Sequence, residues 1–227
     1  LSNNPDAVSV EVPGTVEEYL TVTDNPRPEN FRGVSWWYRK ITIPADQQKK
    51  RFIIYFESVR MRAEVYLDGK LVAYDLIGET PFHVDITDEA KPGTEQLLAV
   101  RVTNPGGNFH WQDFDIMKWG EYNIPPSRSF TGIIGRVKLE SVNPVFISDI
   151  YMQNTPELTK VNAILSFTNE TSSSVKQDVE LIVNEKGNPD KVVFRQTLKA
   201  ISFPAGNHEV TIPVNVPDAK LWDLSTP

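Results

Sequence analysis

The feature that most constrains the fold is a series of short apolar segments separated by turn residues. It begins with residues 34–43, which end in strand-like alternation and stop at Pro44. The next segment, residues 51–57, is apolar on both faces, as the central strand of a sandwich is. These two segments predict neighbouring β-strands in a packed core.

A tight hairpin is predicted directly after these strands. Residues 63–67 and 70–73 alternate between apolar and polar side chains, and Asp68-Gly69 separates them. An Asp-Gly pair between alternating strands is a strong hairpin signal, because the tight turn needs positive φ at both central residues.

Strand patterns recur along the rest of the chain without a convincing helix, which predicts an all-β fold. At Asn143-Pro144 the character changes, because the strands continue while aromatic residues become fewer. We therefore expect a jelly-roll-like, galactose-binding-domain-like sandwich over residues 1–143 and an immunoglobulin-like sandwich over residues 144–227.

Composition excludes several classes of function. The net charge of −7 makes the chain a poor candidate for binding nucleic acid or an anionic membrane, since both need a basic face. There is no cysteine, and the three histidines lack metal-ligand spacing, so no metal or cofactor is predicted. No apolar run reaches membrane-spanning length. The compartment stays open, with a periplasmic or extracellular location favoured.

The segment between residues 103 and 133 is the candidate site. It lacks sustained alternation, and a loop of this length in a compact domain is usually functional or disordered. Its many aromatic residues argue against disorder. Aromatic rings can stack on pyranose faces while polar side chains bind the hydroxyls. The predicted substrate-binding residues are Asn104, His110, Trp111, Asp113, Trp119 and Arg128.

Structural alternatives apply to each of these residues. Trp111 and Trp119 can instead pack the loop onto the sandwich or onto another domain, and Arg128 can form a structural salt bridge. Asp113 and Asp115 suit calcium or a sugar hydroxyl, but two solvated carboxylates are the favoured interpretation.

Two further features have a simple structural interpretation. Trp36 and Trp37 are adjacent in a strand, so they face opposite sides, and one of them belongs to the core. The other faces a second domain or a ligand. Asn169-Glu-Thr171 has the form of a glycosylation sequon, a triplet that often occurs by chance.

The chain resembles the sugar-binding domain of glycoside hydrolase family 2, which includes β-galactosidases, β-glucuronidases and β-mannosidases. The resemblance rests on the order and spacing of many short motifs: Trp37-Tyr-Arg-Lys-Ile-Thr-Ile-Pro44, Phe56-Glu-Ser-Val59, Ala63-Glu-Val-Tyr-Leu-Asp-Gly-Lys-Leu-Val72, Thr80-Pro-Phe82, Asp85-Ile-Thr-Asp88 and Lys91-Pro-Gly93. Residues 217–227 resemble the family's segment that closes the immunoglobulin-like domain, just before the catalytic barrel.

One motif departs from the family pattern. Residues 129–139 resemble the family's Ser-Gly-Ile-aromatic-Arg-Asp-Val strand, but Ile134 takes the aromatic position and an extra Gly135 precedes Arg136. The carboxylate that precedes this motif in the β-galactosidase branch has no counterpart in residues 125–128. This difference argues against a β-galactosidase-like sugar site.

The resemblance implies a non-catalytic N-terminal part of a retaining exo-β-glycosidase. The family's two catalytic glutamates lie on a (β/α)8 barrel that this chain lacks, so carbohydrate and that barrel are the expected partners. The alternative is a self-sufficient carbohydrate-binding or adhesion module, which an aromatic platform on an exposed face would favour. A third interpretation is a structural surface protein that binds no sugar.

Overall fold

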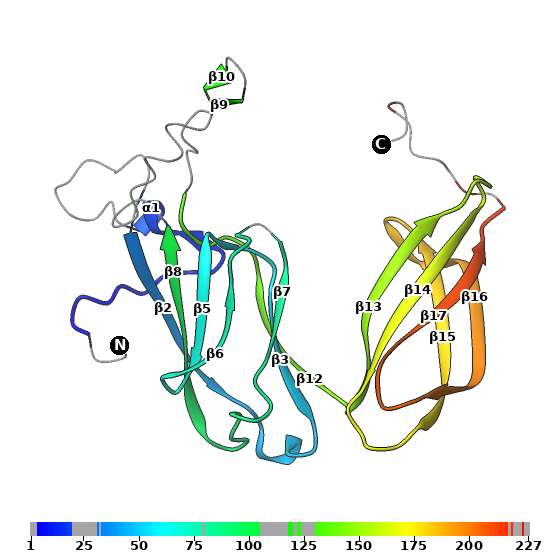
Figure 1. Ribbon diagram of the computed structural model, residues 1–227, viewed down its shortest axis with the longest axis horizontal. Coiled ribbons are helices and arrows are strands. Elements are labelled where there is room, and N and C mark those ends of the chain that lie inside the picture. The colour runs from blue at the N-terminus through cyan, green and yellow to red at the C-terminus, as the bar shows by residue number, and fades with distance from the viewer. Residues whose placement is uncertain are drawn as a thin grey trace. The chain divides into compact units, whose positions relative to one another are not determined.

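A computed structural model describes most of the chain in two compact units, Leu1–Ser141 and Val142–Pro227 (Figure 1). The described residues are 4–19, 31, 33–78, 80–104, 118–119, 122–123, 130–217, 219 and 224, with the backbone alone for 118–119 and 122–123. Every strand pair with a defined register is antiparallel, and the prediction of an all-β chain is confirmed. The predicted boundary between residues 143 and 144 stays a prediction.

The first unit contains two antiparallel sheets that form separate layers in Figure 1. One sheet has the strand order β2-β8-β5-β6, and the other has the order β12-β3-β7. The bounds are β2 Gly33–Thr42, β3 Arg51–Phe56, β5 Arg62–Leu67, β6 Lys70–Asp75, β7 Phe82–Asp85, β8 Glu95–Asn104 and β12 Val137–Val142. A short 3-10 helix, Ala45–Gln47, follows β2.

The core of this unit is formed by apolar residues that alternate along the strands. In β5, Ala63, Val65 and Leu67 are buried, because successive side chains point to opposite faces of a sheet. Strand β3 is apolar on both faces and is the middle strand of its sheet, as the sequence predicts. The rings of Phe56 and Phe82 stack with centroids 4.9 Å apart.

The two adjacent tryptophans of β2 face opposite sides, as predicted. Trp37 is buried, its indole Nε1 donates to Ser35 Oγ at 3.0 Å, and the Tyr19 ring meets it edge-on. Trp36 is 42% exposed on the outward face of the sheet. One tryptophan therefore belongs to the core and the other remains accessible.

The predicted Asp-Gly hairpin joins β5 to β6. Asp68 and Gly69 have φ angles of 49° and 83°, the positive values that this turn requires. The Asp68 carboxylate accepts hydrogen bonds from the side chain of Gln96 and the backbone amide of Leu97, both at 2.9 Å. These hydrogen bonds lower the pKa of Asp68 and connect the turn to β8.

A small three-stranded sheet joins strands from the start, the middle and the end of this unit's sequence. It has the order β1-β11-β4, with β1 at Gly14–Thr15, β4 at Val59–Arg60 and β11 at Gly132–Ile133, and a four-residue helix α1, Val16–Tyr19, follows β1. Two further short strands, β9 Lys118–Trp119 and β10 Tyr122–Asn123, pair with each other.

The extra Gly135 is explained by a close backbone approach. The amides of Ile134 and Gly135 both donate to the carbonyl of Ser58, at 3.1 and 3.0 Å. A Cβ atom added at Gly135 would lie 2.5 Å from the Ser58 nitrogen and 2.7 Å from Glu57 Cβ. Glycine is therefore the residue that lets the two segments meet at this point.

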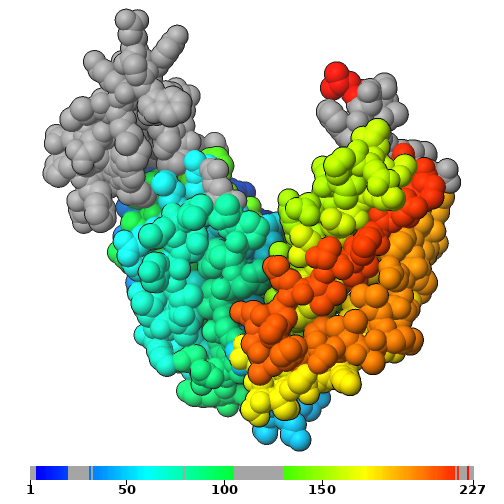
Figure 2. All heavy atoms as spheres, turned by 45° about the vertical axis from the view of Figure 1, so that its right-hand side comes forward, coloured from blue at the N-terminus to red at the C-terminus, as the bar shows by residue number. Residues whose placement is uncertain are grey.

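The second unit contains a sheet of order β13-β14-β17 and a separate pair, β15-β16. The bounds are β13 Val145–Asn154, β14 Lys160–Asn169, β15 Val175–Glu185, β16 Asn188–Phe203 and β17 Gly206–Asn215. Figure 2 shows the red-orange surface of β17 beside the yellow-green surface of its own sheet. A second core lies in this unit, where the rings of Phe167 and Phe203 have centroids 4.6 Å apart.

The sequon asparagine of the second unit is part of its core. The Asn169 amide donates to the carbonyls of Ser173 and Phe203, at 2.9 and 2.7 Å, and its oxygen accepts from the Thr171 amide at 2.9 Å. The side chain is buried and fully engaged, so the folded chain does not offer it for modification.

We predict that Gly135→Ala lowers the free energy of unfolding by about 2 kcal/mol, because the backbone must move to admit a Cβ atom. The matched control is Gly69→Ala, where positive φ is the only obstacle and the cost is about 1 kcal/mol. Urea unfolding of both variants, followed by tryptophan fluorescence, measures the difference. A smaller loss at Gly135 than at Gly69 would contradict the close approach.

Candidate functional site

The structure describes the side chain of one predicted site residue, Asn104, which ends β8. Trp119 pairs with Tyr122 through the backbone, but its side chain lies outside the described residues. The other predicted site residues also lie outside them: His110, Trp111, Asp113 and Arg128. Their contacts with substrate stay a prediction.

Four residues meet where the segment between residues 104 and 130 begins and ends. We call Glu17, Phe31, Asn104 and Thr131 the loop-base cluster. Asn104 Nδ2 donates to the Phe31 carbonyl at 2.5 Å, and Thr131 Oγ1 donates to the same oxygen at 3.2 Å. The Glu17 carboxylate accepts from the amides of Phe31 and Thr131, at distances of 2.9 to 3.1 Å.

Burial makes these hydrogen bonds important for the local structure. Asn104 and Thr131 are 3% and 0% exposed, and buried polar groups need partners to offset the loss of water. The Thr131 carbonyl in turn accepts from the Val16 amide at 2.7 Å. Asn104 and Thr131 are thus both held by the Phe31 carbonyl, and Thr131 is also held by Val16 and Glu17 of α1.

Sequence reasoning missed Glu17 and Thr131. Only a local signal was available: Thr15 and Glu18 have capping-box spacing, and the Glu18 amide donates to Thr15 Oγ1 at 3.2 Å. That signal predicts the short helix α1. It does not predict that the neighbouring Glu17 bonds an amide 114 positions away.

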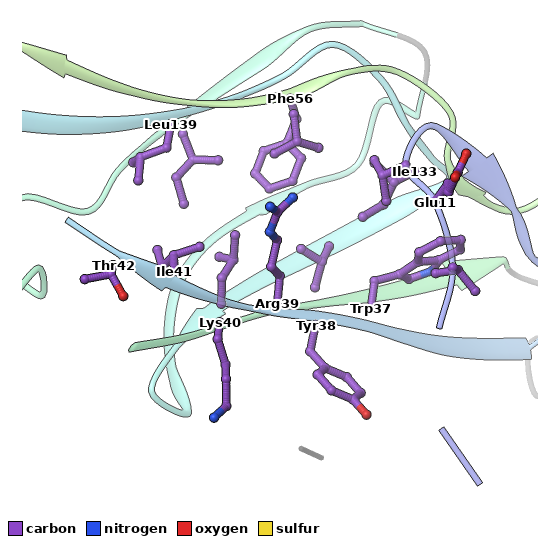
Figure 3. Close-up of a pocket in the computed structure, with 16 residues that line it drawn as sticks. Glu11, Trp37, Tyr38, Arg39, Lys40, Ile41, Thr42, Phe56, Ile133 and Leu139 are labelled. Carbon is purple, nitrogen blue, oxygen red and sulfur yellow. The ribbon is translucent and has the colours of Figure 1, made fainter. Parts of the chain in front are cut away.

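A cleft of about 890 Å³ opens along the edge of the first unit, between β2 and β12 (Figure 3). Phe56, Ile133 and Leu139 contribute to its apolar walls, and Arg39 points into it from β2. Glu11 is the single carboxylate among the described residues that line it. These described lining residues therefore contain no pair of carboxylates such as glycoside hydrolysis requires.

An ion pair joins Arg136, the residue before β12, to Glu57, the residue after β3. Arg136 donates from Nε to Glu57 Oε2 at 3.1 Å and from Nη2 to Oε1 at 3.2 Å, and its amide also donates to Oε2 at 3.0 Å. The side-chain hydrogen bond from Arg136 is the largest influence on Glu57 and lowers the pKa of Glu57 to about 2. The pair helps to hold the segment that follows Gly135.

We searched the described residues for metal-binding clusters and for membrane-spanning helices. The described residues contain no group of three or more His, Asp or Glu side chains that could hold a metal ion. Within the same residues, no helix is long and apolar enough to cross a membrane.

Comparison with known protein families decides the classification. The family described as glycosyl hydrolases family 2, sugar binding domain, matches residues 7–124, more than half of the chain. The chain belongs to this family. The resemblance found in the sequence motifs is thereby confirmed.

Curated relatives extend the match along the chain. A β-glucuronidase from Formosa agariphila is 26% identical over 204 residues, which cover 85% of this chain and 20% of the relative. A β-galactosidase from Thermoanaerobacter pseudethanolicus is 32% identical over 126 residues, covering 55% of this chain and 16% of the relative. The chain spans about a fifth of the length of these relatives.

Solved structures have the same fold. A β-glucuronidase from Bacteroides uniformis superposes with a TM-score of 0.71 at 20% identity, covering 96% of this chain and 25% of that chain. A family 2 β-glucuronidase gives a TM-score of 0.71 at 24% identity, covering 97% of this chain and 24% of that chain. At this identity the likeness concerns the fold alone.

Glu17→Ala is expected to lower the free energy of unfolding by about 2 kcal/mol, because two amides lose a charged acceptor. Glu17→Gln should cost less, since one amide oxygen in the Oε1 position accepts from both donors. Glu11→Gln is the control, because it removes a carboxylate from an exposed position. Urea unfolding of the three variants tests the order, and equal losses for all three would contradict the role of the cluster.

The ion pair between Glu57 and Arg136 predicts how the free energy of unfolding depends on pH. The folded pKa of about 2 lies below the ordinary value of 4.5, so the unfolded chain takes up this proton first. The stabilisation that the Glu57–Arg136 pair gives the folded chain is therefore complete above pH 4.5 and is lost as the pH falls toward 2. The stability difference between the wild type and Glu57→Gln should shrink over this interval.

The measurement is the urea midpoint of both proteins between pH 2 and pH 6. Glu140→Gln is the control, because Glu140 has no ion pair among the described residues and should not alter the profile. A constant difference between the wild type and Glu57→Gln across the range would refute the prediction.

Proposed function

We propose that this chain is the non-catalytic N-terminal part of a retaining exo-β-glycosidase of family 2. Its role is to support the catalytic barrel and to contribute carbohydrate contacts from residues 104–130. The family match over residues 7–124 supports the assignment. The similar proteins are named β-glucuronidases and β-galactosidases, and this chain spans about a fifth of their length.

The loop-base cluster is the observation that carries the proposed role of the loop. Asn104 and Thr131 are hydrogen-bonded to the same carbonyl, so the segment between them leaves and rejoins the sandwich at one place. Fixed ends reduce the conformational entropy that a loop loses when it binds a ligand. Trp111 and Trp119 then supply ring faces for a pyranose, and His110, Asp113 and Arg128 supply hydrogen bonds.

We expect Trp111→Ala and Trp119→Ala in the complete enzyme to lower kcat/KM on an aryl β-glycoside by about tenfold, because each removes a stacking surface. Tyr151→Ala is the control, since it removes an exposed aromatic side chain from the second unit. Steady-state assays with thermal melting separate a binding effect from unfolding. Unchanged kcat/KM in both tryptophan variants would contradict the role of the loop.

The 227-residue chain alone should hydrolyse no aryl β-glycoside and should bind simple sugars weakly, because the pocket is completed by the barrel. Calorimetric titration with monosaccharides tests this expectation. Tight binding of a monosaccharide by the chain alone would instead favour a self-sufficient binding module.

A further inference from the structure

The outward side of the four-stranded sheet carries a second, different set of aromatic and charged residues. We call it the aromatic face, and it consists of Trp36, Tyr38, Arg62, Glu64, Tyr66, Tyr74 and Arg101. On β2, β5 and β8 these residues alternate with the buried residues, so they point away from the core, and Tyr74 of β6 lies opposite Glu64 on the same side of the sheet. None of them belongs to the segment between residues 104 and 130.

The strand register aligns these residues across the sheet. Trp36 is opposite Arg101, Arg101 is opposite Glu64, and Glu64 is opposite Tyr74. The row crosses four strands and therefore spans about 14 Å, at about 4.8 Å between neighbouring strands. An aromatic ring stands at each end of the row, and the span is longer than one pyranose ring.

The rings at the two ends are accessible. Trp36 is 42% exposed and Tyr74 is 66% exposed. The Trp36 ring also packs on Tyr66, with centroids 5.5 Å apart. Ala99 faces the same side but is only 4% exposed, and its cross-strand partners are Tyr38 on one side and Tyr66 on the other. The aromatic side chains of Trp36 and Tyr66 therefore form one continuous surface rather than isolated rings.

The centre of the face is charged. Glu64 accepts from Arg101 Nη1 at 2.8 Å and from Arg62 Nη2 at 2.9 Å. Burial raises the pKa of Glu64, but the hydrogen bond from Arg101, the positive charges of Arg101 and Arg62, and the Tyr66 hydroxyl together outweigh it, so the pKa is lowered. Two guanidinium groups against one carboxylate leave an excess positive charge, in a chain whose net charge is −7.

This arrangement favours an acidic carbohydrate over a protein partner. The cores of protein interfaces are depleted of charged residues, whereas this face has an ion triad at its centre. Sugar hydroxyls can bond both arginine and glutamate, ring faces stack on aromatic side chains, and guanidinium groups pair well with carboxylates. The local positive charge is complementary to the carboxylates of uronic acid residues.

We propose that the aromatic face, which is made of residues outside the segment 104–130, binds a polysaccharide chain that carries uronic acid residues. Trp36 and Tyr74 stack on sugar rings at the two ends of the row, and Arg62 and Arg101 bind carboxylates and hydroxyls between them. Such a surface holds the protein on a polymer while hydrolysis takes place elsewhere.

Unused hydrogen-bonding capacity lies beside this row. Arg62 is opposite Thr103 in the register. Arg62 Nε and Thr103 Oγ1 are buried and have no hydrogen-bond partner among the described residues. A polysaccharide that shifts the Arg62 side chain gives both atoms a partner.

The test is affinity gel electrophoresis of the 227-residue chain in polygalacturonate and in neutral galactan. Polygalacturonate should retard the wild type at low salt, and the retardation should fall as salt screens the charges. Trp36→Ala and Tyr74→Ala should each weaken binding about fivefold, the effect of one lost stacking contact. Arg62→Gln should weaken binding and reduce its dependence on salt.

Tyr151→Ala is the matched control, because Tyr151 is exposed on β13 of the second unit, and it should bind like the wild type. No retardation of the wild type, equal retardation by galactan, or an equal loss in Tyr151→Ala would overturn the proposal. Sedimentation velocity tests whether a second copy of this chain, rather than a polysaccharide, binds the aromatic face. A dimer that Trp36→Ala dissociates would identify the face as a self-association surface and would also overturn it.

This inference goes beyond the proposed role of the loop, and the two can fail separately. Loss of catalytic efficiency in Trp111→Ala with unchanged polymer binding supports the loop proposal alone. Loss of polymer binding in Trp36→Ala with unchanged kcat/KM on a small aryl glycoside supports the aromatic face alone.

Discussion

The Glu17 carboxylate connects segments that are far apart in the sequence. It accepts amide hydrogen bonds from Phe31 and from Thr131, which lies 114 positions away. Charge-assisted hydrogen bonds of this kind are stronger than neutral ones, and removing the acceptor leaves partly buried amides without a partner. The path of the chain into and out of residues 104–130 depends on this carboxylate, together with the Phe31 carbonyl that Asn104 and Thr131 share.

Much of the fold was predictable because local sequence patterns indicate where strands and tight turns form. Apolar alternation located β2, β3 and β5, and Asp68-Gly69 located the hairpin through its positive φ angles. Local patterns do not report which distant backbone approaches a side chain. The contact of Glu17 with Thr131 and the close approach at Gly135 were therefore beyond sequence reasoning, although Gly135 was recognised as a departure. The candidate loop was chosen by its composition, and of its residues Asn104 alone has a described side chain.

The two candidate carbohydrate surfaces differ in the physics that they use. The loop of residues 104–130 has ends fixed by buried hydrogen bonds, which suits a small site completed by another domain. The aromatic face is a sheet surface whose rings lie at the ends of a charged row, which suits a long polymer and weak, salt-dependent binding. A sandwich can serve both purposes because its core is independent of what its outward residues contact.

A crystal structure of the complete protein with a bound, unreactive glycoside tests the central claim most directly. The account predicts that Glu17 and the Phe31 carbonyl hold the ends of the loop as they do here, and that Trp111 or Trp119 contacts the sugar. The account is contradicted if no residue between 104 and 130 reaches the glycoside, or if Thr131 and Asn104 are released from the loop-base cluster in the complex.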